Sequence, residues 1–142
     1  MSYAIDLNIL LLASNSEAAE YAAAHSFLEE RATRPELLCL AWPTVMGYLR
    51  VATHPSIFSH PLSPREALAN IRGLLALPQA RALGEGEGFL EIYEKIGGIS
   101  LRGNLVPDAH LAAILFQHGV TTLYTRDAGF RRFDFLEVRD PF

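Results

Sequence analysis

The chain has 142 residues, half of them hydrophobic and a fifth charged, a balance typical of one globular core. A formal net charge of -4 excludes nucleic-acid binding that depends on a wholly basic surface, although bound cations can hold a phosphodiester in an acidic site. The amino terminus has no basic region before its apolar residues, so we expect neither a signal peptide nor a membrane span. The single cysteine, Cys39, cannot form an internal disulfide. We therefore expect one cytoplasmic domain spanning residues 1–142.

The first half of the chain alternates short apolar runs with longer amphipathic segments. Runs of strand length end at Asp6 and at Trp42, and Pro43 suits the first turn of the helix that follows. Trp42 is expected to anchor the core beside the sheet. In chain order, the predicted elements are a strand at 1–5, helices at 7–13 and 17–33, a strand at 37–42 and a helix at 44–53.

The second half begins with the clearest helix start in the chain. Ser63 stands at the cap, Pro64 at the first helical position and Glu66 at the third, which is the pattern of a capping box. The later predicted elements are a helix at 67–77, a weakly marked strand at 80–83, helices at 87–96 and 109–118, and strands at 120–124 and 135–138. Helices that alternate with short apolar strands predict an α/β fold with a parallel sheet covered on both faces.

Three aspartates occupy similar positions in this predicted fold. Asp6 and Asp127 each follow a strand and Asp108 opens a buried helix, so all three can lie along the edge where the strands end. Asp108 and Asp127 also have ordinary alternatives, as a helix cap and as a turn residue. Asp6 is harder to explain in that way, because an acid inside an apolar passage loses its hydration. Clustered carboxylates favour a hard divalent cation, Mg²⁺ or Mn²⁺, which can activate water against a phosphodiester.

Several short motifs resemble those of PIN domains, and specifically of the VapC toxins of bacterial toxin–antitoxin pairs. The motifs are Asp6-Leu7-Asn8, Pro107-Asp108-Ala109-His110-Leu111-Ala112-Ala113, Gly119, and Thr125-Arg126-Asp127 followed by Phe130 and Phe133. The likeness continues to Asp140-Pro141-Phe142 and includes Trp42 and Leu49-Arg50-Val51. It implies a PIN-like three-layer α/β/α fold with a small central parallel sheet.

The resemblance also implies a function. VapC toxins are metal-dependent endoribonucleases, usually homodimers, and each is neutralised by a VapB-type antitoxin whose carboxy-terminal segment covers the active groove. By this likeness, Asp6, Asp108 and Asp127 hold Mg²⁺ or Mn²⁺ for the hydrolysis of RNA. Asn8 and Thr125 orient the acids, the water or the phosphate.

A further patch suited to RNA phosphates and bases is expected next to the last aspartate. It combines basic and aromatic side chains, at Arg126, Phe130, Arg131, Arg132 and Phe133. A solvated turn is an equal alternative for these residues. We therefore expect Arg126 to contact the substrate or to support the residues that do.

The sequence departs from the family pattern at two positions. Many members carry acids where this chain has Gly47 and Gly129, and their absence favours a single metal ion. Glu17 and Glu20 could substitute in principle, but solvated helix positions explain them more simply.

Two alternatives to a ribonuclease stay open. The first is a PIN-like protein with weak or lost catalysis that binds RNA or an antitoxin. The second is a phosphatase-like hydrolase with Asp6 as its nucleophile. Asn8 weakens the second alternative, because it stands where such hydrolases usually carry another aspartate.

Overall fold

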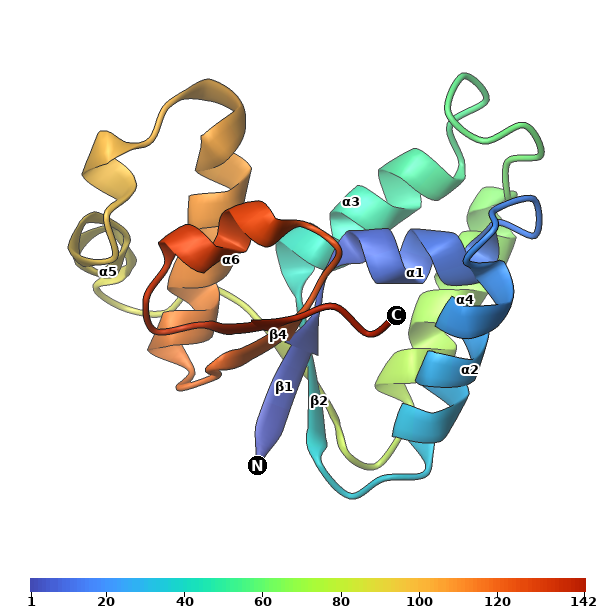
Figure 1. The fold of residues 1–142 in the computed structure, drawn as a ribbon, viewed down its shortest axis with the longest axis horizontal. Helices are drawn as coiled ribbons and strands as arrows, with labels where there is room; N and C mark the ends of the chain where they lie inside the picture. Colours follow the sequence, from blue (N-terminus) through green and yellow to red (C-terminus); the bar gives the residue numbers. More distant parts are fainter.

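A five-stranded parallel sheet forms the centre of the fold. The computed structural model describes all 142 residues, and Figure 1 shows their arrangement. The strands are β1 (Ser2–Ile5), β2 (Leu37–Ala41), β3 (Ala80–Leu83), β4 (Thr122–Tyr124) and β5 (Glu137–Arg139), in the order β3-β2-β1-β4-β5. Because β1 pairs with β2 on one side and with β4 on the other, the direction of winding reverses next to β1. Open α/β sheets bind ligands at such a point, outside the carboxyl ends of the strands.

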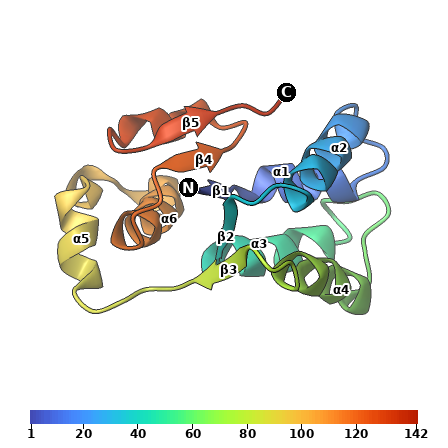
Figure 2. The same ribbon diagram turned by 90° about the horizontal axis from the view of Figure 1, so that it is seen from below.

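Helices cover both faces of the sheet, which confirms the predicted three-layer α/β/α architecture. The helices are α1 (Leu7–Ser14), α2 (Tyr21–Ala32), α3 (Trp42–Ala52), α4 (Pro64–Leu75), α5 (Phe89–Lys95) and α6 (Val106–Gln117). Helices α1 to α4 lie on one side of the sheet and α5 and α6 on the other (Figure 2). None of the helices is long and apolar enough to cross a membrane, and the cytoplasmic location stays a prediction.

Alternating side chains along β1 supply both layers of the core. Tyr3 and Ile5 pack in the core with α1, α3 and α4, whereas Ala4 packs on the other face with α6. Successive residues of a strand point to opposite faces, so a strand covered on both sides is apolar at every position. Six residues of α6 are buried, and this packing fixes the first turn of α6, which carries Asp108.

Most predicted elements are confirmed, including the weakly marked β3 and the capping box of α4, but several helix starts differ, most of all those of α2 and α6. The predicted start of α2 at residue 17 is wrong: the helix begins at Tyr21, because the side chain of Asn15 accepts the amide of Glu17 in a preceding turn, at 3.2 Å. α6 begins earlier than predicted, at Val106. Asp108 therefore lies inside the first turn of α6 and does not cap it.

The core position predicted for Trp42 is also wrong. Trp42 is 47% exposed, because it is the first residue of α3 and not the last residue of β2. Its indole lies against Gly84, where an added Cβ would stand 3.3 Å from Trp42 Cδ1. A large apolar side chain is thus left on the surface.

Candidate functional site

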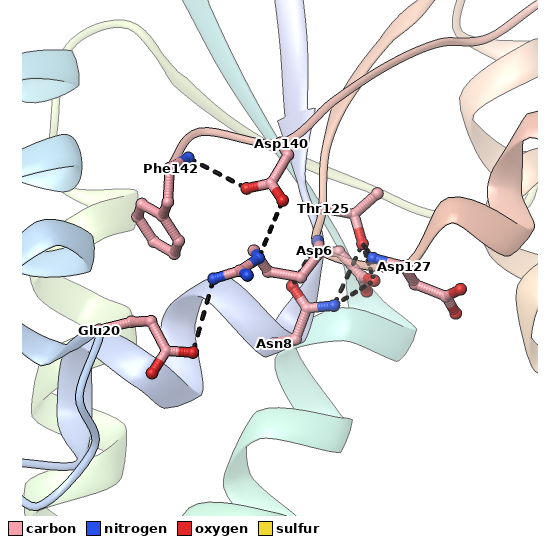
Figure 3. Close-up of polar contacts among 8 residues, drawn as sticks. Asp6, Asn8, Glu20, Thr125, Asp127, Asp140 and Phe142 are labelled. Atoms are coloured by element: carbon pink, nitrogen blue, oxygen red, sulfur yellow. Dashed lines mark hydrogen bonds and ion pairs between the residues drawn. The ribbon is translucent and has the colours of Figure 1, made fainter.

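Two neighbouring strands deliver the polar residues of the candidate site. β1 pairs with β4, and Ile5 lies opposite Tyr124. The amide of Asp6 donates to the carbonyl oxygen of Tyr124 at 2.9 Å. Asp6 and Thr125 are the next residues along the two strands. Their side chains meet at the carboxyl edge of the sheet (Figure 3), where the sequence places Asp6.

The hydroxyl of Thr125 is the centre of a hydrogen-bond network. It donates to Asp6 Oδ2 at 2.8 Å, and it accepts from Asn8 Nδ2 at 3.1 Å and from the backbone amide of Asp127 at 3.0 Å. A hydroxyl has one donor and two acceptor positions, so its capacity is fully used. Because Thr125 is only 1% exposed, water does not compete for these bonds. The network therefore fixes the orientation of Asp6 and Asn8 before any ligand binds.

Asp6 is a buried carboxylate that makes no ion pair with a basic side chain. Its Oδ1 caps α1 by accepting from the amide of Leu7 at 2.7 Å. Burial raises the pKa of Asp6, the hydrogen bonds from Thr125 and Leu7 lower it in part, and the negative charge of Asp127 raises it further. A nearby cation would stabilise the charged form of such an acid.

Asp108 and Asp127 lie near Asp6, but the three carboxylates do not surround a common point. Burial and the charges of Asp127 and Asp6 raise the pKa of Asp108, which Arg132 lowers. The carboxylate of Asp127 points away from Asp6 (Figure 3) and accepts from the amide of Gly129 at 2.8 Å. No three acidic, histidine or cysteine side chains form a ready-made ligand set.

The chemistry of this group fits a hard divalent cation. Its members offer carboxylate oxygens, which Mg²⁺ and Mn²⁺ prefer, and Mg²⁺ commonly binds to one or two carboxylates while it keeps several waters. Burial is the main cause of the raised pKa values of Asp6 and Asp108, and the negative charges of the neighbouring aspartates add to it. The sequence prediction of metal ligation by Asp6, Asp108 and Asp127 stays a prediction.

The two glycines that replace acids of the family pattern lie at this site. An added Cβ at Gly47 would stand 3.1 Å from Leu7 Cδ2. A side chain at position 47 would therefore lie next to Leu7, the neighbour of Asp6 in the chain. An added Cβ at Gly129 would stand 2.9 Å from Asp127 Oδ1. A side chain at position 129 would therefore require the carboxylate of Asp127 to move from its present orientation.

Arg126 lies beside the network, and its charge is already partnered. Its Nε pairs with Asp140 at 2.9 Å and its Nη1 approaches Glu20 at 3.5 Å. The guanidinium also lies 5.2 Å from the ring centroid of Phe142. Sequence reasoning missed the contacts of Glu20 and Asp140 with Arg126, because no local pattern marks a pairing between distant segments.

The aromatic half of the predicted RNA patch is wrong. Phe130 and Phe133 are each 2% exposed and belong to the core, so neither can stack on a base. Phe130 lies within the 3₁₀ turn Ala128–Arg132 and Phe133 directly follows it. Their spacing of three puts both side chains on the same side of such a turn. Arg131 and Arg132 stay exposed.

A parallel sheet between two helical layers, with aspartates at the ends of its central strands, defines the PIN-domain class. The chain is 38% identical to ribonuclease VapC48 of Mycobacterium tuberculosis over 143 residues, covering 100% of this chain and 99% of that protein. It is 34% identical to VapC ribonuclease Mb2897 of Mycobacterium bovis, covering 96% and 93%. The chain therefore belongs to the VapC ribonuclease family.

Solved structures show the same fold. The structure of VapBC2 from Rickettsia felis bound to a promoter DNA fragment matches with a TM-score of 0.68 at 15% identity, covering 98% of each chain. M. tuberculosis VapC20, described as a toxin that cleaves the sarcin-ricin loop, matches with a TM-score of 0.67 at 18% identity, covering 98% of this chain and 100% of that one. No family model matches the chain.

Proposed function

We propose that this chain is a toxin of a toxin–antitoxin pair and acts as a metal-dependent endoribonuclease. The observation that carries the proposal is the buried Asp6, held by Thr125 where the winding of the sheet reverses, with the negative charges of Asp127 and Asp108 nearby. Its relatives are named ribonucleases, and this supplies the substrate class. The geometry alone would also serve other phosphodiesters.

The residues have distinct roles in this proposal. Asp6, Asp108 and Asp127 would hold one Mg²⁺ or Mn²⁺, since Gly47 and Gly129 remove two further acids. Such a cation, when bound, lowers the pKa of a water and offsets phosphate charge. Thr125 keeps Asp6 Oδ2 in one orientation through its hydroxyl.

Removing the metal should abolish cleavage. Pure protein incubated with structured RNA and Mg²⁺ or Mn²⁺ should produce fragments on a denaturing gel, and EDTA should prevent them, because the aspartates alone cannot neutralise a phosphodiester. Restoring Mn²⁺ in excess of EDTA should restore the fragments. Cleavage that continues unchanged in EDTA would contradict metal dependence. If millimolar Mg²⁺ and Mn²⁺ neither bind nor support cleavage, the family fold acts here only as a binding partner.

The antitoxin is proposed to occupy a groove among the helices that follow β1 and β2 and the helix α4. This groove, of about 740 Å³, lies among α1, α2 and α4 and has 18 lining residues, of which 11 are hydrophobic. Glu29 and Glu66 are among them, so the groove fits an amphipathic segment with basic residues. Co-expression with the product of a small adjacent reading frame should give a copurifying complex without ribonuclease activity. Retention of full activity in that complex would exclude this product as the antitoxin.

A homodimer is proposed to form through the exposed face of α3. Trp42 and Met46 lie one turn apart and are 47% and 60% exposed, and buried tryptophans contribute strongly to interfaces. The change Trp42→Glu should weaken dimerisation by roughly 30-fold or more, the equivalent of about 2 kcal/mol. Sedimentation analysis at several concentrations measures this effect, with circular dichroism as the control for folding. A variant that dimerises like the wild type would place the interface elsewhere.

A further inference from the structure

A second recess opens next to the acidic site, on the other side of Asn8. Its volume is about 390 Å³. Leu11, Leu12 and Phe58 form its apolar wall, and the polar residues that line it are Asn8, Asn15, Glu20 and Arg126. Asn8 belongs to both places, because its Nδ2 donates to Asp6 Oδ2 at 3.3 Å and to Thr125 at 3.1 Å. A group bound in the recess is thus one side chain away from the carboxylates.

The polar residues of the recess keep hydrogen-bonding groups that the protein does not use. Asn15 accepts the amide of Glu17 through Oδ1, which leaves its Nδ2 as a donor. Glu20 has a single contact, from Oε2 to Arg126 Nη1 at 3.5 Å, which leaves Oε1 as an acceptor. Arg126 uses Nε and Nη1, and its Nη2 is without a partner. The recess therefore offers a carboxylate and a guanidinium side by side over an apolar wall.

We propose that this recess binds the guanine base of the RNA nucleotide next to the phosphate that is cleaved. The inference rests on the proposed ribonuclease function and specifies its substrate. Guanine carries two adjacent donors, N1–H and the 2-amino group, which match the two oxygens of Glu20. Its acceptors O6 and N7 match an arginine, which is the commonest specific contact to this base. The face of the base would lie on the apolar wall of Leu11 and Leu12, which the buried side chain of Phe58 completes.

The other bases match this set of groups less well. Adenine lacks the pair of adjacent donors, and uracil has only one N–H donor on its pairing edge. Cytosine offers its amino group to a carboxylate but has no O6 and N7 pair for Arg126. The contact between Glu20 and Arg126 is long and half exposed, and such surface pairs contribute at most about 1 kcal/mol. A base can therefore displace this contact at little cost.

Asp140 and Phe142 act in this site as positioning residues. Asp140 holds Arg126 Nε at 2.9 Å and Phe142 packs over the guanidinium, while the amide of Phe142 donates to Asp140 at 3.0 Å (Figure 3). These contacts leave Arg126 Nη2 available. The segment after β5 thus contributes to base selection without contacting the base.

Binding of single nucleotides to the metal-free protein tests this inference. In EDTA, an NMR titration with GMP should shift the amide resonances of Asn8 and Asn15. GMP should bind at least about tenfold tighter than AMP, as expected for one good base contact. IMP, which lacks the 2-amino group, should bind more weakly than GMP. Glu20→Gln should remove the preference for GMP, whereas the nearby control Glu17→Gln should keep it.

The same titration with CMP and UMP completes the comparison. Three results would overturn the guanine site: equal affinity for GMP, AMP, CMP and UMP, a preference for CMP, or shifts confined to residues outside the recess. The measurement needs neither metal nor cleavage, so it separates the two proposals. A protein that cleaves RNA but binds the nucleotides equally retains the ribonuclease function and loses the base site. A protein that prefers GMP but does not cleave RNA retains the base site alone.

Discussion

The variant Asp6→Asn should lose RNA cleavage by at least about a hundredfold. Loss of a residue that only orients a metal ligand costs up to about a hundredfold, and loss of a ligand should cost at least as much. Asparagine keeps the size of Asp6 and an oxygen that can accept from the amide of Leu7, but it removes the negative charge that a divalent cation requires. Cleavage of the same RNA at saturating Mg²⁺ or Mn²⁺ measures the loss. A variant that cuts at the wild-type rate would show that Asp6 does not carry the chemistry.

Thermal unfolding of the two proteins supplies an independent measurement of the Asp6→Asn effect. A ligand that binds only the folded state raises its stability, so Mn²⁺ should raise the melting temperature of the wild type and have little effect on the variant. The matched control is Glu17→Gln, which removes an acid paired with His60 at 3.2 Å, away from Thr125. This control should keep the full response to Mn²⁺.

The difference in stability between the wild type and Asp6→Asn should depend on pH, and the raised pKa of Asp6 fixes the direction of this dependence. The pKa of Asp6 is raised in the folded state above its ordinary value of 3.8, so between these two values the folded protein binds more protons than the unfolded chain. Stability therefore falls as pH rises through this window and rises as pH falls. Without metal, the unfolding free energy of the wild type minus that of Asp6→Asn should increase as pH is lowered through the raised pKa. A difference that is constant with pH would contradict the raised pKa.

Thr125→Val should weaken both the fold and the activity. Valine has nearly the shape of threonine, but it removes the hydroxyl that joins Asp6, Asn8 and the amide of Asp127. Leaving these buried groups unsatisfied costs about 1–3 kcal/mol of unfolding free energy, which chemical denaturation measures. Loss of a group that orients a ligand lowers metal affinity or activity by roughly 10–100-fold.

The pH profile distinguishes positioning of Asp6 from general destabilisation by Thr125→Val. The hydrogen bond from Thr125 lowers the pKa of Asp6, so its loss should move the acidic limb of the cleavage profile to higher pH. Thr125→Ser keeps the hydroxyl and should keep the profile near that of the wild type. If the valine variant matches the serine variant in rate and profile, the hydroxyl has no role in the site.

Local patterns predicted the fold and one edge of the site. The apolar runs before Asp6 and before Thr125, and the Ser63 capping box, depend on near neighbours, and the structure confirms these strands and this helix start. Parallel topology predicted that Asp6 and the residues after β4 lie at the same edge of the sheet, because the carboxyl ends of adjacent parallel strands meet.

Features that depend on distant segments could not be predicted in this way. Trp42 is exposed and Phe130 is buried because of where α3 begins and how the turn after β4 packs on the core. The contacts of Arg126 with Glu20 and Asp140 join three separate parts of the chain. Asp127 points toward Gly129 because of one backbone hydrogen bond, and no residue pattern specifies that rotation.

The pairing of β1 with β4 has a consequence for synthesis of the protein. Asp6 is among the first residues made, yet its partner Thr125 follows 119 positions later. At roughly 5–20 residues per second, translation needs about 6–24 s to cover that distance. During this interval β1 has no β4 beside it, and the carboxylate of Asp6 has no hydroxyl to orient it. In the proposed function, cleavage would therefore begin only after almost the whole chain has been made.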